Sequence, residues 1–224
     1  DIGGVKVRPT FRADARFKEG VKKTELEKRL DYFVEKGCKI ADYGFDFIDE
    51  ADENLAWLIE NCYKRKMILQ LHFGTFRNVN AKMYERCGKD SGFDIMRGAI
   101  DTDALVEICD RDNVRLGGLP KIVVCRLNDY DLRAIATLTG AFPSVKLGAA
   151  WWFNDTVNGI KRQMETAAEY SALGTQYGML TDSRSFSSYV RFDFYRRILS
   201  SFIGERVENG EYDENAAIAL ARKI

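Results

Sequence analysis

The amino-acid sequence predicts an α/β fold of the (β/α)8-barrel type, in which parallel strands are covered by helices. Short apolar runs alternate along the chain with longer stretches whose apolar residues recur at helical spacing, and this alternation is typical of a parallel sheet. Most of the runs are continuously apolar, which indicates strands buried on both faces. Six strand–helix units are recognisable, whereas a complete barrel has eight. An open doubly wound sheet also fits six strands, although no glycine-rich dinucleotide loop is present.

The expected strands are short and lie at residues 5–7, 38–41, 67–71, 121–127, 145–150 and 177–181. Helices are expected between and after them, at residues 22–35, 49–66, 101–111, 129–138, 158–173, 189–208 and 214–223. Gly37 follows the first of these helices, at the position where a glycine commonly ends a helix. Residues 78–98 are polar and rich in charge, so we expect a loop that covers the functional site.

Composition restricts the class of protein. With 224 residues, of which 46% are hydrophobic, the chain can bury one large core or two modest ones. Lysine plus arginine and aspartate plus glutamate are balanced at 34 each, which disfavours nucleic acid and anionic membranes as partners. The five cysteines include no Cys-x-x-Cys pair, and no apolar run approaches the roughly 20 residues that span a bilayer. We therefore expect a globular protein of the reducing cytoplasm.

Charged and aromatic side chains follow several expected strands. Asp182 and Arg184 come directly after the last one, while Arg12 and Arg77 follow two earlier ones. Because the carboxyl ends of parallel strands meet at one edge, these groups are expected to converge. Arginine binds carboxylates through two parallel hydrogen bonds, so the set predicts an anionic small substrate such as a sugar acid. The alternative is that Asp182 only caps a helix that begins near Ser185.

Three further residues have a structural and a functional interpretation. His72, the single histidine, ends an expected strand and is either a site residue or a hydrogen-bonded core histidine. Trp151 and Trp152 either line the site or pack in the core. His72, Asp182 and Asp42 could together form a metal site. A zinc site usually has three protein ligands, and the sequence does not require a metal site here.

Several motifs resemble those of uronate (glucuronate) isomerase, a divergent family of the amidohydrolase superfamily. The most specific are Trp-Trp-Phe-Asn-Asp at residues 151–155 and Thr-Asp-Ser-Arg-Ser-Phe at 181–186. Five further motifs occur in the same order as in the family: Pro-Thr-Phe-Arg at 9–12, Leu-His-Phe-Gly at 71–74, Arg-Asn at 77–78, Gly-Phe-Asp at 92–94 and Tyr-Arg-Arg-Ile-Leu at 195–199. The resemblance covers essentially the whole chain.

The resemblance implies a distorted barrel enzyme of carbohydrate catabolism. Its reaction would be the aldose–ketose isomerisation of D-glucuronate to D-fructuronate and of galacturonate to tagaturonate. It further implies a divalent metal ion, commonly zinc, held by a His-x-His pair and by Asp182. Asp182 would move the substrate proton, with Arg184 beside it as an electrostatic stabiliser and His72 as a third catalytic residue. Arg12, Arg77, Trp151 and Trp152 would bind the substrate.

Among the departures from the family pattern, two remove histidines. The His-x-His motif is absent, so we expect residues 1–224 to form a single barrel domain that lacks the first two strands. The family's Ser-Asp-His reads Ala41-Asp42-Tyr43 here. Three functions stay open: a uronate isomerase of which this sequence is a part, a metal-dependent hydrolase of the superfamily, and a non-catalytic remnant that binds sugar acids. The expected partner is a uronate, with no nucleic acid or membrane and with a possible homo-oligomer.

Overall fold

A computed structural model describes residues 4, 6–46, 52–99, 101–183 and 185–224. At its centre is a parallel five-stranded sheet with the strand order β1-β2-β3-β6-β7. Each strand is added to the same edge of the sheet, as in a (β/α) barrel, whereas a doubly wound sheet reverses this direction. The order therefore contradicts the doubly wound alternative. The five strands are β1 (Thr10–Arg12), β2 (Ile40–Phe45), β3 (Ile68–Phe73), β6 (Lys121–Cys125) and β7 (Val145–Leu147).

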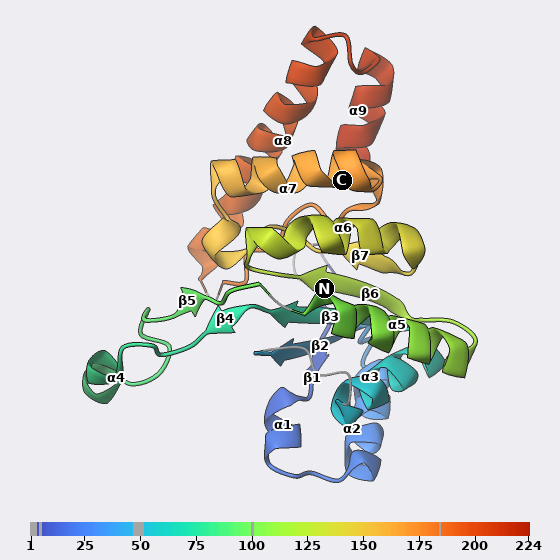
Figure 1. The fold of residues 1–224 in the computed structure, drawn as a ribbon, viewed down its shortest axis with the longest axis vertical. Coiled ribbons are helices and arrows are strands. Elements are labelled where there is room, and N and C mark those ends of the chain that lie inside the picture. Colours follow the sequence, from blue (N-terminus) through green and yellow to red (C-terminus); the bar gives the residue numbers. More distant parts are fainter. Residues whose placement is uncertain (1–3, 5, 47–51, 100, 184) are drawn as a thin grey trace.

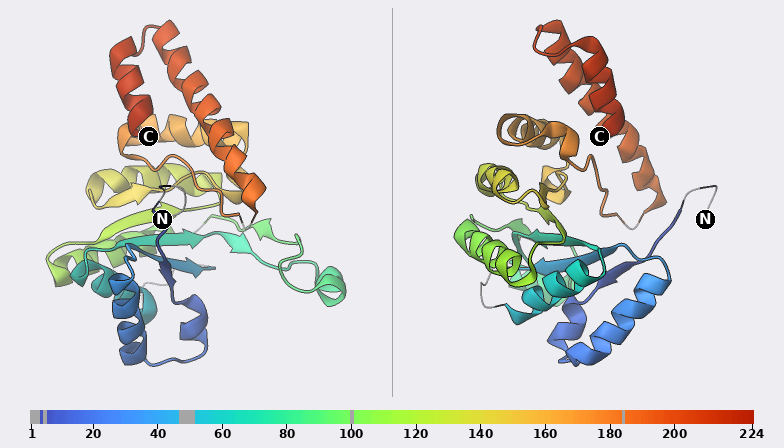
Figure 2. Two further views of the ribbon diagram at one scale, coloured as in Figure 1. Left: turned by 180° about the vertical axis from the view of Figure 1, so that it is seen from behind. Right: turned by 90° about the vertical axis from the view of Figure 1, so that its right-hand side faces the viewer.

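Helices connect successive strands and cover one face of the sheet, as Figure 2 shows in its right-hand view. Three of them begin at a side chain that accepts hydrogen bonds from the first turn: Asp52 before α3, Asp101 before α5 and Thr156 before α7. Apart from the short α4 (Ala81–Cys87), the helices before residue 171 are α1 (Asp14–Lys18), α2 (Lys23–Glu35), α3 (Glu53–Lys64), α5 (Thr102–Leu116), α6 (Leu132–Ala141) and α7 (Val157–Tyr170). After them, α8 (Arg191–Glu208) and α9 (Glu214–Lys223) form a helical hairpin that extends from the body (Figure 1).

The two faces of the sheet differ because side chains alternate along each strand. In β3, Leu69, Leu71 and Phe73 are buried in the main core against the helices. Gln70 and His72 of the same strand point to the opposite side, which we call the inner face. A second apolar cluster lies there, formed by Val123, Cys125, Leu127 and Trp151.

All five strands of the sheet have limits that differ from the expected ones, and β6 and β7 end earlier, at Cys125 and Leu147 rather than at residues 127 and 150. The first is β1 at Thr10–Arg12, whereas Lys6 and Val7 are irregular and residue 5 lies outside the described part. β2 and β3 run further than expected and include Asp42, Tyr43 and His72. These polar residues are tolerated in the strands because their neighbours supply hydrogen bonds.

The sixth expected strand, residues 177–181, is wrong: the described backbone there forms no strand. Leu180 packs against the apolar cluster of the inner face. The apolar pattern therefore reports burial correctly, but a strand also requires a hydrogen-bonded neighbour, which a sequence pattern does not reveal.

The expected covering loop at residues 78–98 is an arm rather than a loop. The two-residue strands β4 (Thr75–Phe76) and β5 (Ile95–Met96) pair antiparallel, and α4 (Ala81–Cys87) lies between them. Figure 1 shows this arm projecting away from the sheet. Four 3-10 turns complete the described structure: η1 (Asp129–Asp131), η2 (Trp152–Asn154), η3 (Leu173–Thr175) and η4 (Phe186–Val190). Among the helices of the described residues, none has the length and apolarity to cross a bilayer.

Candidate functional site

A hydrogen-bonded pair of Asp42 and His72 lies on the inner face, across two neighbouring strands. The Nδ1 atom of His72 is 3.0 Å from Oδ1 of Asp42, and Nε2 of Gln70 donates to the same oxygen at 3.0 Å. Asp42 and Gln70 are register partners of β2 and β3, so the parallel pairing itself brings them together. A carboxylate can only accept, so Nδ1 of His72 donates to Asp42. In the neutral ring Nε2 is then an acceptor, and in the charged ring both nitrogens donate.

Arg12 at the end of β1 completes this group. Its Nη2 lies 3.4 Å from Nε2 of His72, and its Nε lies 2.9 Å from Asp14 and 3.6 Å from Asp42. Burial alone would lower the pKa of Arg12, but the carboxylates of Asp14, Asp42 and Asp182 outweigh it and raise that pKa. Arg12 therefore stays a cation, and more than half of its side chain remains exposed and accessible to an anion.

Burial works against the charge of Asp42 and would raise its pKa. The hydrogen bond and charge of His72, the hydrogen bond from Gln70 and the charge of Arg12 outweigh burial, so the pKa of Asp42 is lowered below its ordinary value. Asp42 is thus a fixed anion that orients the ring of His72.

Gly44 provides the space for that ring. A Cβ atom at this position would lie 2.3 Å from Nε2 of His72, which is far inside van der Waals contact. Gly44 and His72 are register partners, so the absence of a side chain on β2 allows the imidazole to lie across the neighbouring strand.

The two tryptophans follow β7; Trp151 directly precedes the 3-10 turn η2, and Trp152 is the first residue of that turn. The ring of Trp151 meets that of His72 edge-on, with centroids 5.7 Å apart. Trp151 is buried, and its indole N–H has no hydrogen-bond partner among the described residues. A buried donor without a partner is uncommon. Trp152 has a positive φ of 51°, which turns the chain so that its ring stacks on Phe153.

Arg77 lies at the base of the arm and meets the second tryptophan. Its guanidinium lies over the ring of Trp152 at 5.2 Å, within the range of a cation–π interaction. Asp94 directly precedes β5. Its carboxylate forms an ion pair with Arg77 at 3.2 Å and also accepts a hydrogen bond from the backbone N–H of Asn78 at 2.7 Å. Arg77 therefore stands apart from the group around Arg12 and His72, and Trp151 and Trp152 connect the two.

Asp182 is exposed and stands at the end of the segment that packs on the inner face. Its charge raises the pKa of Arg12. Burial, with added contributions from Asp42 and Asp182, raises the pKa of the Cys125 thiol to about 12. The electrostatic influence of Asp182 thus reaches the inner face. The helix-cap interpretation is wrong, because Ser185 caps η4 through Ser187. Arg184 lies outside the described residues.

Tyr43, which replaces a histidine of the family pattern, faces away from this group. Its ring is buried on the helix side against Phe17, and its hydroxyl donates to Asp52 at 2.8 Å. Burial, and then the hydrogen bond to Asp52, raise its pKa. The strand alternation thus places Asp42 in the site and Tyr43 outside it. Sequence reasoning considered Asp42 only as a possible metal ligand and did not single out Gln70; the signal for Gln70 was a polar residue at every second position of an apolar strand.

The donor set of the described residues does not by itself make a metal site. No group of three or more His, Cys, Asp or Glu side chains that could hold a metal ion occurs among them. The nitrogen Nδ1 of the single histidine is engaged by Asp42. We therefore derive no catalytic step through a metal ion.

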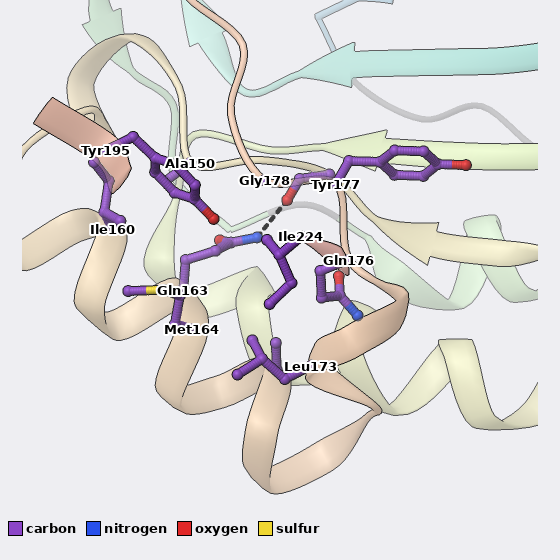
Figure 3. A pocket seen from close by; sticks show the side chains of 12 residues that line it. Ala150, Ile160, Gln163, Met164, Leu173, Gln176, Tyr177, Gly178, Tyr195 and Ile224 are labelled. Atoms are coloured by element: carbon purple, nitrogen blue, oxygen red, sulfur yellow. Dashed lines mark hydrogen bonds between the residues drawn. The ribbon is translucent and has the colours of Figure 1, made fainter. Parts of the chain in front are cut away.

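A small cavity of about 20 Å³ lies away from this group, between α7 and the segment before Asp182 (Figure 3). Gln163 of α7 lies at its wall and donates to the backbone oxygen of Gly148. Leu173, Tyr195 and Ile224 form much of the remaining lining. The space fits about one water molecule and is too small for a sugar acid.

Comparison of the sequence with known proteins indicates one family. A family model described as "Glucuronate isomerase" matches residues 49–224. The uronate isomerase of Serratia proteamaculans is 37% identical over 221 residues, which cover 83% of this chain and 47% of that protein. The uronate isomerase of Caldanaerobacter subterraneus is 36% identical over 234 residues, or 89% of this chain and 50% of that protein.

Solved structures show the same relationship. The crystal structure of uronate isomerase from Thermotoga maritima superposes with a TM-score of 0.81 at 27% identity, covering 90% of this chain and 51% of that one. Glucuronate isomerase from Caulobacter crescentus gives a TM-score of 0.77 at 25% identity, covering 88% and 47%. The chain spans about half the length of the curated relatives it matches. The resemblance drawn from the motifs is confirmed, and the chain belongs to the uronate (glucuronate) isomerase family.

Proposed function

We propose that this protein acts in the aldose–ketose isomerisation of uronates, converting D-glucuronate to D-fructuronate and galacturonate to tagaturonate. The observation that supports this most is the meeting of Arg12, Asp42, His72 and Trp151 on the inner face in a chain of this family. The group combines a cation, an oriented imidazole and a free indole donor. These are the groups that an anionic, polyhydroxylated substrate requires.

In the proposed mechanism, Asp182 removes the proton from C2 of the aldose. The C1–C2 enediol forms, and the same carboxyl group returns the proton to C1 while the hydroxyl proton passes from O2 to O1. The Nε2 atom of His72 is suited to this second transfer, because the hydrogen bond of Nδ1 to Asp42 leaves Nε2 of the neutral ring as an acceptor. Arg184 would stabilise the oxyanion that develops during enolisation.

Substrate binding is assigned to the two arginines and the tryptophans. Arg12 would bind the substrate carboxylate, and Arg77, held over Trp152, would bind the far end of the sugar acid. Trp151 would donate its unpartnered indole N–H to a substrate hydroxyl. The proposed site is therefore longer than the group around His72 alone.

The test is the Asp182→Asn variant, assayed with D-glucuronate and D-galacturonate for ketose formation. Asparagine cannot accept the C2 proton, so turnover should fall by at least about 10³-fold, while the unfolding midpoint stays within about 2 °C. Asp110→Asn on the exposed side of α5 is the control and should keep full activity. Retained turnover in Asp182→Asn would contradict the assignment.

The same preparations distinguish the other functions. Uronate binding without ketose formation by the unmodified protein would indicate a sugar-acid-binding protein, and cleavage of ester or amide substrates would indicate a hydrolase. That Asp182 is a metal ligand, with zinc as the metal, remains a proposal. A zinc content that is lower in Asp182→Asn than in the unmodified protein would support it.

Four broader assignments are proposals as well. Residues 1–224 would form a single catalytic domain, since one main core includes residues from Phe11 to Ala217. A cytoplasmic location is supported by the five cysteines, all of which lie in described segments and are free thiols. Balanced charge supports a uronate as the partner rather than nucleic acid or a membrane. A homo-oligomer is testable by light scattering.

A further inference from the structure

Asp155, the last residue of the Trp-Trp-Phe-Asn-Asp motif, has a buried carboxylate. Its side chain is 1% exposed and forms an ion pair with Arg191. Among the described residues, no other group donates a hydrogen bond to this carboxylate. A carboxylate is stable in such surroundings only with a counter-charge, so Asp155 depends on Arg191.

Arg191 is the first residue of α8. A cation in the first turn of a helix is unfavourable, because the N-terminal end already carries partial positive charge. Its pairing with Asp155 offsets this effect and ties the start of α8 to the turn that follows β7. The ion pair thus joins the turn that carries Trp151 and Trp152 to the segment that carries Asp182.

Serine hydroxyls connect the described residues between Asp182 and Arg191. The Oγ atom of Ser183 accepts from the backbone N–H of Ser185 at 3.1 Å and from the hydroxyl of Ser188. Ser185 in turn caps the 3-10 turn η4. These contacts connect Ser183, the neighbour of Asp182, with η4, which leads directly into α8, so a shift of Arg191 is expected to reach Asp182.

The other side of Asp182 is also held by α8. A Cβ atom on Gly178 would lie 2.9 Å from the backbone oxygen of Ile224 and 3.1 Å from the ring of Tyr195. The segment that leads into Asp182 is therefore packed directly on α8 and the end of the chain. Asp182 thus lies in the chain between Gly178, which packs on Tyr195, and Arg191, which pairs with Asp155.

We propose that Asp155 and Arg191 are positioning residues, whose ion pair sets the place of Asp182 relative to Trp151 and His72. For its catalytic readout the inference rests on the proposed function. Neither residue is expected to touch the substrate. Their loss should therefore change the rate of the proton transfer more than the binding of the uronate.

The experiment compares Asp155→Asn, Arg191→Lys and Asp193→Asn. Asparagine keeps the shape of Asp155 without its charge, and lysine keeps the charge of Arg191. Asp193 forms an exposed pair with Arg197 one turn further along α8 and is the matched control. For each variant we would measure kcat and KM with D-glucuronate, and hydrogen–deuterium exchange of residues 177–190.

For Asp155→Asn we expect kcat to fall by roughly 10- to 100-fold, the size of effect that a misplacement of about 1 Å can have. KM should change by less than about threefold, and exchange in residues 177–190 should accelerate by roughly tenfold or more. Arg191→Lys should retain most of kcat, and Asp193→Asn should match the unmodified protein. Normal exchange in Asp155→Asn, with or without a loss of kcat, overturns the inference. If the unmodified protein forms no ketose, the proposed function fails. The exchange result alone then decides whether the ion pair of Asp155 and Arg191 holds residues 177–190 in place.

Discussion

Asp42 is a largely buried carboxylate that remains ionised because His72, Gln70 and Arg12 outweigh the effect of burial. Its pKa is lowered in the folded protein, so its contribution to stability is fully present above the ordinary aspartate pKa of about 3.9. That contribution is lost as the pH falls through the lower value of the folded state, since the unfolded chain then binds the proton more readily.

The Asp42→Asn variant should therefore lose less stability on acidification than the unmodified protein. Asparagine has no proton to gain below about pH 4, so the difference in free energy of unfolding between the two proteins should shrink as the pH is lowered. Urea unfolding at a series of pH values from about 6 to 2.5 measures this difference. Parallel curves would show that the neighbours of Asp42 do not lower its pKa.

At the scale of single residues, the motifs predicted which side chains lie close together better than they predicted the contacts that hold them. Arg12, His72 and Trp151 meet as expected at one edge of the sheet. The partner that orients His72 is Asp42, whose role depends on the register of β2 against β3. Register is set by pairing in three dimensions and leaves only a weak periodic signal in a short strand.

At the scale of elements, the arm formed by β4, α4 and β5 brings Arg77 to Trp152. A two-stranded sheet of this length is not stable by itself, so local contacts at its base decide where Arg77 lies. Asp94 supplies two of them: its side chain is 7% exposed, and it contacts both Arg77 and the backbone of Asn78. The arm is therefore tied to the body at the point where it approaches the site.

The Asp94→Asn variant should weaken uronate binding. The amide oxygen can still accept from Asn78, but the charge that holds Arg77 is lost. Because Arg77 is partly exposed, we expect a change of about 1 kcal/mol, which is a roughly fivefold increase in Kd for D-glucuronate by calorimetry. Asp90 also faces Arg77, at 3.9 Å and with half of its side chain exposed, so Asp90→Asn should change Kd much less. Equal effects of the two variants would contradict the role of Asp94.

At the scale of the whole molecule, the main core continues from β1 through the sheet to α9. It includes Phe11 on β1, Leu69 in the central strand and Ala217 on α9. Elements that share one core are expected to unfold together, which is the physical basis for treating residues 1–224 as one domain.

Leu69→Ala removes a fully buried side chain from the centre of this core. The free energy of unfolding should fall by about 2–5 kcal/mol. Tryptophan fluorescence and far-ultraviolet circular dichroism should still report one coincident transition. Val114→Ala, at a position on α5 that is 75% exposed, is the control and should leave the midpoint unchanged. Separate transitions for the two signals would indicate two domains instead of one.

The sequence by itself determined the α/β class, the positions of most helices within a few residues and the family, because these depend on local periodicity, helix caps and short motifs. It also singled out Arg12, His72 and Trp151, which the structure brings together. Only the tertiary structure decided that Asp42 and Gln70 hold His72, that Tyr43 faces the helices, that residues 78–98 form an arm and that residues 177–181 are not a strand. Each of these depends on a partner distant in the chain, and strand pairing, register and ion pairs across elements leave no local pattern from which that partner could be identified.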